Sequence, residues 1–116
     1  MDAVILAGGK GTRMEDDLPK PLVKVKGKAI IEHQINYLFS SGIIEKIIIS
    51  LGHRASEIIQ YIKEKYPESQ IVYSIESEPL GTGGAIKRAL QFSTAEKVVV
   101  INYDDLTNIP INYLET

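Results

Sequence analysis

An apolar strand that runs directly into a glycine-rich loop has the clearest chemical meaning in this chain. Residues 4–14 read VILAGGKGTRM. Glycine tolerates positive φ and lets backbone N–H groups approach a ligand closely. Arg13 and, seven residues later, Lys20 add cationic donors of the kind that bind phosphate oxygens. The segment predicts a phosphate-bearing ligand and favours a nucleotide over a tight turn with solvated charges, which would need fewer glycines and cations.

The spacing of the glycines excludes two common phosphate-binding motifs. No G-x-x-x-x-G-K-[ST] sequence occurs, so the loop is not a Walker A motif. The dinucleotide fingerprint would need a glycine where Met14 stands, and the strand that ends at Ser50 supplies no acid for a ribose. NAD binding is therefore not expected.

Two further segments carry candidate chemistry. Asp104 and Asp105 follow the last apolar run, and Mg²⁺ takes one or two carboxylates together with phosphate oxygens. An Asx-type turn is the alternative for this pair, and a nearby phosphate loop favours the metal.

Residues 76–85 read ESEPLGTGGA, which predicts a helix start with Thr82 as its cap. The additional glycines indicate a flat ligand lying on the backbone. His33 and His53 lack metal-ligand spacing and are expected to be surface or core residues.

Strands and helices alternate along the chain. Continuous apolar runs indicate strands buried on both faces, and strands separated by helices pair in parallel through right-handed crossovers. We therefore expect an α/β fold with three layers: a Rossmann-like, mostly parallel sheet of strand order 3-2-1-4 with helices on both faces. The predicted strands are residues 2–7, 46–50, 70–75 and 97–102, with a short extended piece at 22–25. The predicted helices centre on residues 31–38, 58–66 and 85–90.

This strand order places the candidate residues together. The chain changes direction between the first and fourth strands, and ligands bind outside the carboxyl ends of the strands at such a switch point. The glycine loop follows the first strand, and the aspartate pair follows the fourth. Anion donors and carboxylates are therefore expected at one crevice.

The composition is that of an ordinary globular domain. The chain has 116 residues, of which 44% are hydrophobic and 24% charged. A net charge of −2 argues against nucleic-acid binding. The lack of cysteine excludes disulfides and thiolate metal sites and fits a cytoplasmic protein. No membrane span or signal peptide is expected. Residues 109–114 resemble the start of another element, which indicates half of a longer unit.

Together, these segments resemble the nucleotidyltransferases that activate sugar 1-phosphates. The resemblance covers the whole chain but only about the first half of a family catalytic domain. Residues 1–116 are therefore expected to be the N-terminal nucleotide-binding part of a single, truncated domain of the nucleotide-diphospho-sugar transferase type. The matching pieces are LAGGKGTRM at 6–14, LPKPL at 18–22, GK at 27–28, EPLGTGG at 78–84 and NYD at 102–104.

The resemblance implies an enzyme that transfers NMP from an NTP to a sugar 1-phosphate, with Mg²⁺ as cofactor and pyrophosphate as product. Arg13 would hold the triphosphate, Lys20 would neutralise charge near the α-phosphate, and Asp104 or Asp105 would bind the metal. Such transfer depends on positioning and charge neutralisation rather than on a covalent nucleophile. The implied nucleotide-binding residues are Leu6, Ala7, Gly8, Gly9, Lys10, Gly11, Thr12, Glu76, Gly81 and Thr82.

Glu76 carries the prediction of the base. Uridylyl and thymidylyl members of the resembled family commonly have glutamine at this position. A carboxylate only accepts hydrogen bonds, and guanine offers two adjacent donors. The E-x-EPLGT run at residues 76–82 also resembles the mannose and heptose 1-phosphate guanylyltransferases, so GTP and a mannose-like sugar 1-phosphate are the expected substrates.

Tyr103 departs from the family pattern, because glycine usually precedes the metal aspartate. A phenol there could crowd the nucleotide or stack on it. Two other functions stay open: a non-catalytic nucleotide-binding or regulatory module, and a cytidylyltransferase or an enzyme like the molybdopterin guanylyltransferases. The LGTGG segment favours the hexose phosphates. An apolar surface left by a missing half could also pair copies into a homo-oligomer.

Overall fold

The computed structural model describes residues 1–8, 19–52, 54–67, 70–76 and 81–104. A parallel four-stranded sheet forms its centre, with the order β5-β4-β1-β6. This is the 3-2-1-4 order predicted from the sequence, and the predicted Rossmann-like fold is confirmed. The strands are β1 (Asp2–Leu6), β4 (Lys46–Leu51), β5 (Ile71–Ile75) and β6 (Val98–Asn102).

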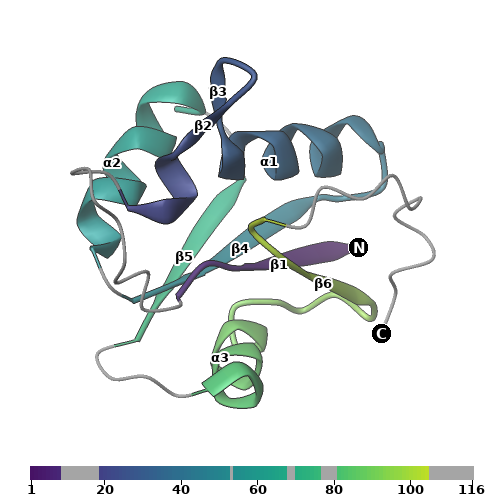
Figure 1. Cartoon of the computed structure of the whole chain (residues 1–116). Coiled ribbons are helices and arrows are strands. Elements are labelled where there is room, and N and C mark those ends of the chain that lie inside the picture. The colour runs from purple at the N-terminus through teal and green to yellow at the C-terminus, as the bar shows by residue number, and fades with distance from the viewer. Residues whose placement is uncertain (9–18, 53, 68–69, 77–80, 105–116) are drawn as a thin grey trace.

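Helices cover both faces of this sheet, as expected (Figure 1). In this view, α1 and α2 lie above the sheet and α3 lies below it. Among the described residues, no helix has the length and apolar character needed to cross a membrane. The helices are α1 (Ile30–Ser40), α2 (Ala55–Lys65) and α3 (Gly81–Leu90).

The core is divided in two by the central strands. In β1, Ala3 and Ile5 belong to the cluster packed under α1 and α2, whereas Val4 belongs to the cluster that includes Ala89 of α3. All three β1 residues are fully buried. Successive side chains of a strand point to opposite faces, so a strand covered on both sides reads as an unbroken apolar run. Burying a valine or isoleucine side chain, such as those of Val4 and Ile5, contributes roughly 1.5–3 kcal/mol.

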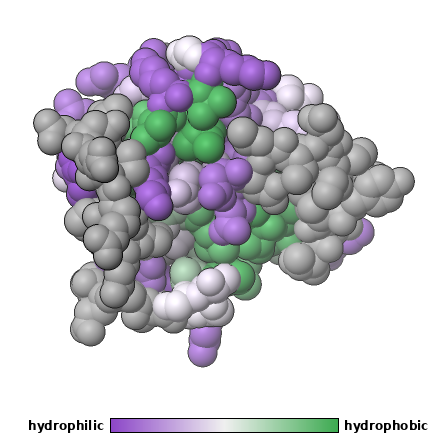
Figure 2. All heavy atoms as spheres, in the orientation of Figure 1, coloured by the Kyte–Doolittle hydropathy of each residue, from purple (hydrophilic) through white to green (hydrophobic). Residues whose placement is uncertain are grey.

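A hairpin replaces the single extended piece predicted at residues 22–25. The 3-10 turn η1 (Lys20–Leu22) leads into β2 (Lys24–Val25), which pairs antiparallel with β3 (Lys28–Ala29). The connecting residues Lys26 and Gly27 have φ of 53° and 84°. Two positive φ values are typical of a tight hairpin turn, but only the glycine was a sequence signal for it. Figure 2 shows hydrophilic residues across the upper end of the molecule, where this hairpin lies.

Two helix starts differ from the sequence prediction. α3 begins at Gly81, so Thr82 lies in its first turn and the predicted cap at Thr82 is wrong. Gly81 has a φ of +73°, a conformation that favours glycine at the entry to this helix. α2 begins at Ala55, three residues before its first isoleucine. The element expected at residues 109–114 lies outside the described residues.

Candidate functional site at the carboxyl edge of the sheet

Hydrogen bonds extend the sheet one residue beyond the strand ends at its carboxyl edge. The N–H of Ala7 donates to the carbonyl of Ser50 at 2.8 Å, and the N–H of Glu76 donates to the carbonyl of Leu51 at 2.8 Å. These bonds hold the residues after β1 and β5 against β4. The first predicted nucleotide-binding segment and Glu76 therefore share one edge, although 69 positions separate Ala7 from Glu76 in the sequence.

Gly8, Gly52 and Glu76 pack closely at this edge. A Cβ atom on Gly8 would lie 2.7 Å from Oε1 of Glu76 and 3.6 Å from the backbone nitrogen of Gly52. A Cβ atom on Gly52 would lie 3.3 Å from the carbonyl oxygen of Gly8 and 3.9 Å from Oε1 of Glu76. β4 lies between β5 and β1, so the Glu76 side chain reaches across the end of β4 toward Gly8. Gly52 is not among the residues predicted from the sequence, where its signal is a glycine at the end of a buried strand.

Replacing Gly8 with alanine is expected to displace the Glu76 carboxylate, because the end of a flexible side chain yields more easily than backbone. If this carboxylate binds the base, the affinity for GTP falls about tenfold, as for a lost hydrogen bond to a charged group. Titration calorimetry measures the affinity, and a urea unfolding midpoint reports stability. In a double-mutant cycle, Gly8→Ala should add little to Glu76→Ala. Fully additive losses would contradict this coupling.

Asp104 follows β6 at the same edge. The N–H of Tyr103 donates to the carbonyl of Leu6 at 3.0 Å, which ties the residue after β6 to the end of β1. The Tyr103 ring is partly buried and packs against the core cluster on the α1 and α2 side. Burial raises the pKa of Tyr103, and the negative charge of Asp104 adds to this effect. The ring thus supports the strand end, and the Asp104 carboxylate is exposed.

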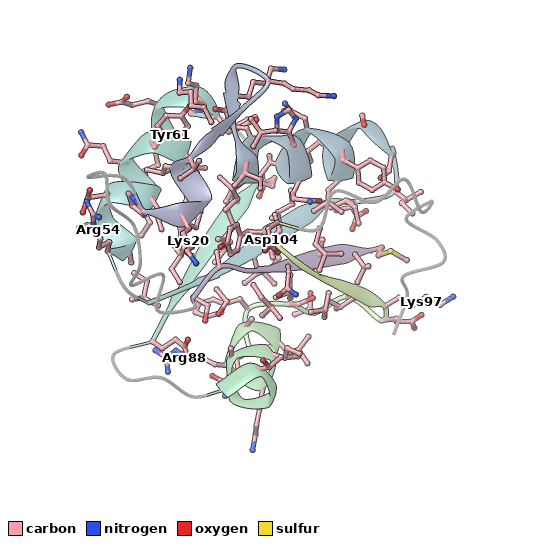
Figure 3. The ribbon with its side chains drawn as sticks, viewed as in Figure 1. Lys20, Arg54, Tyr61, Arg88, Lys97 and Asp104 are labelled. Atoms are coloured by element: carbon pink, nitrogen blue, oxygen red, sulfur yellow. The ribbon has the colours of Figure 1, made fainter. Side chains whose placement is uncertain are left out.

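Lys20 stands on the η1 turn, between two prolines (Figure 3). The N–H of Leu22 donates to the carbonyl of Pro19 at 2.9 Å, and the N–H of Val23 donates to the carbonyl of Lys20 at 3.1 Å. Pro21 and Leu22 are buried, whereas Lys20 is exposed. The turn is therefore anchored in the core, and it presents the ammonium group of Lys20 to solvent.

Part of the predicted site lies outside the described residues: Gly9, Lys10, Gly11, Thr12, Arg13 and Asp105. Their roles stay predictions. In the part of the chain that is described, no three histidine, aspartate or glutamate side chains group as a metal site. Gly81 and Thr82 lie in the exposed first turn of α3. Nε2 of His33 lies 2.7 Å from the carbonyl of Val25, a structural contact in line with the prediction for this histidine.

The parallel sheet, covered by helices on both faces, defines a Rossmann-like α/β protein, and glycines and a carboxylate pack at its carboxyl edge. A family model described as nucleotidyl transferase matches residues 2–115, and the chain belongs to this family. Nucleotidyltransferases of this family generally use a divalent metal ion.

The chain is similar to two curated D-glycero-alpha-D-manno-heptose 1-phosphate guanylyltransferases. It is 43% identical to that of Aneurinibacillus thermoaerophilus over 109 residues, which cover 91% of this chain and 47% of the relative. It is 40% identical to that of Campylobacter jejuni over 118 residues, which cover 99% of this chain and 52% of the relative. The chain therefore spans about half the length of the curated relatives it matches.

A solved structure supports the same relationship. The chain superposes on HddC from Yersinia pseudotuberculosis, complexed with GMP-PN, with a TM-score of 0.78 and 45% sequence identity. The match covers 89% of this chain and 47% of that chain. The resemblance to sugar 1-phosphate nucleotidyltransferases, and among them to guanylyltransferases, is confirmed.

Proposed function

We propose that the full gene product transfers GMP from GTP to a mannose-like sugar 1-phosphate, such as a heptose 1-phosphate. A phosphate oxygen of the sugar 1-phosphate attacks the α-phosphorus of GTP, the bond from this phosphorus to the bridging oxygen breaks, and pyrophosphate leaves. Residues 1–116 are the N-terminal nucleotide-binding part of this domain. Similarity to guanylyltransferases supports the reaction. We further propose a cytoplasmic location, because the reaction consumes a nucleoside triphosphate.

The observation that carries the choice of base is the packing of the Glu76 carboxylate against Gly8 and Gly52. At this place, a carboxylate is held against Gly8, the residue at which the predicted nucleotide loop begins. Its two oxygens can accept the ring N–H and the exocyclic amine of guanine together, whereas uracil offers only one N–H between two acceptors. The solved relative complexed with GMP-PN adds support.

The phosphates are assigned to the cationic residues and to Mg²⁺. Lys20 neutralises charge near the α-phosphate, and Arg13 holds the triphosphate. Asp104 fits a Mg²⁺ ion chemically, because it is an exposed carboxylate at the carboxyl edge and this ion needs only one or two carboxylates beside phosphate and water oxygens. When bound, the ion neutralises phosphate charge.

The base assignment is tested by titrating the full gene product and its Glu76→Gln variant with GTP and UTP. The unaltered protein is expected to prefer GTP. The variant should lose about tenfold or more in GTP affinity. Glutamine replaces one carboxylate oxygen with an NH₂ group, and this donor would face an N–H donor of guanine. Glu64→Gln, the same change at an exposed position on α2, is the matched control and should leave both affinities unchanged. Binding of UTP or dTTP without binding of GTP would contradict the assignment.

A further inference from the structure

Glu32 is a buried carboxylate that lies outside the proposed site. This residue of α1 is only 6% exposed. One of its oxygens, Oε1, accepts a hydrogen bond from the N–H of Ala29 at 3.1 Å and a second from the hydroxyl of Tyr61 on α2. Within the described residues, no ion pair involves Glu32. A buried polar group is costly unless it is hydrogen-bonded, so these two hydrogen bonds define where the carboxyl group can lie.

The first of these bonds fixes the base of the β2–β3 hairpin. Ala29 ends β3 and pairs with Lys24 of β2. The N–H of Ile30 donates to the carbonyl of Val23 at 2.8 Å, which closes the hairpin where the chain leaves η1. Glu32 thus joins the start of α1 to the hairpin that directly follows the Lys20 turn.

The second bond joins this unit to α2. The hydrogen bond to Glu32 is the main reason that the pKa of Tyr61 is raised to about 12, as expected when a hydroxyl donates to a carboxyl oxygen. The η1 turn contacts both α1 and α2 and has Pro21 and Leu22 buried. Figure 3 shows Tyr61 on α2 and Lys20 on the turn. The direction in which Lys20 leaves the core therefore depends on how α1 and α2 are held together.

We propose that Tyr61 and Glu32 are positioning residues for Lys20. Their hydrogen bond locks the two helices that enclose η1, and the locked turn holds the Lys20 ammonium in one place relative to the bound triphosphate. This inference rests on the proposed role of Lys20 in the transfer reaction.

The test compares Tyr61→Phe with Tyr66→Phe in the full gene product. Both changes delete one hydroxyl that bonds to a side chain of α1, but the Tyr66 hydroxyl donates at 2.7 Å to Oδ1 of Asn36, four residues after Glu32, and not to Glu32 itself. Tyr61→Phe is expected to lower kcat about tenfold and to change the KM for GTP less than twofold, because a misplaced group costs most in the transition state. Tyr66→Phe should leave kcat unchanged. Equal losses of kcat in both variants would overturn the inference.

A double-mutant cycle of Tyr61→Phe with Lys20→Ala separates the proposed role of Lys20 in the reaction from the proposed positioning role of Tyr61. If Lys20→Ala leaves kcat unchanged, the proposed role of Lys20 fails and the positioning role falls with it. If Lys20→Ala lowers kcat and Tyr61→Phe lowers it equally in both backgrounds, Lys20 is needed but Tyr61 does not act through it. The inference requires Tyr61→Phe to have no further effect once Lys20 is absent. If Tyr61→Phe does not fold, Glu32→Gln replaces it in the cycle, because glutamine keeps an acceptor oxygen. Glu32→Gln should lower kcat about threefold when Lys20 is present and should have no further effect when Lys20 is absent.

Discussion

Lys20→Ala is expected to lower the kcat of the full gene product by about 10²–10³-fold, the usual effect of removing a group that stabilises transition-state charge. The side chain is exposed, whereas the turn beneath it is anchored by Pro21 and Leu22, so the fold should survive the change. Pyrophosphate release measures kcat, and a urea unfolding midpoint confirms that stability is retained. Lys20→Arg should recover only part of the rate, because a planar guanidinium places its charge differently.

The control for Lys20 is Lys24→Ala. Lys24 is also an exposed lysine, at the start of the neighbouring hairpin strand, so its removal changes the net charge of the same region by the same amount. It should leave kcat within about twofold, since Lys24 has no proposed contact with the phosphates and exposed charges are screened by salt. Equal losses for the two lysines would contradict a specific role for Lys20 and would indicate a general electrostatic effect.

Asp104→Asn is expected to raise the half-saturating Mg²⁺ concentration at least about tenfold, as a lost bond to a charged group would. Turnover at low Mg²⁺ should fall with it. Chelation of divalent ions should abolish pyrophosphate release in the unaltered protein, and added Mg²⁺ should restore it. Activity is measured against Mg²⁺ concentration at saturating GTP, so that weaker Mg²⁺ binding is distinguished from weaker GTP binding.

Glu96→Gln is the matched control for Asp104. It neutralises another exposed carboxylate close to β6, on the N-terminal side of the strand, and should leave the Mg²⁺ dependence unchanged. Asp105→Asn gives the decisive comparison, since the sequence leaves either aspartate as the ligand. A normal Mg²⁺ dependence in Asp104→Asn, together with a shifted one in Asp105→Asn, would assign the metal to Asp105.

The sheet could be predicted from the sequence because its central strands are covered on both sides. Runs such as residues 47–49 contain no polar position, and the intervening helices require parallel crossovers. The start of α2 was missed because its first turn, at Ala55 and Glu57, carries no apolar stripe. The hairpin was missed because one of its two turn residues is a lysine with positive φ, which is rare for that residue type.

The site could be predicted only as a set of segments. The rule for switch points brought Gly8 and Asp104 to one edge, and the hydrogen bond between Tyr103 and Leu6 agrees with it. The Glu76 side chain extends across Gly52 because the strand order is β5-β4-β1 and because glycine has no side chain to block it. Such a contact is tertiary, so no local pattern in the sequence contains it.

The most direct test of the proposed function is pyrophosphate release by the full gene product, supplied with GTP, Mg²⁺ and a mannose or heptose 1-phosphate. We expect one pyrophosphate for each GDP-sugar formed, and none when the nucleotide, the metal or the sugar phosphate is omitted. Tight GTP binding without pyrophosphate release, over a panel of sugar 1-phosphates, would contradict the transfer reaction and favour a non-catalytic nucleotide-binding module.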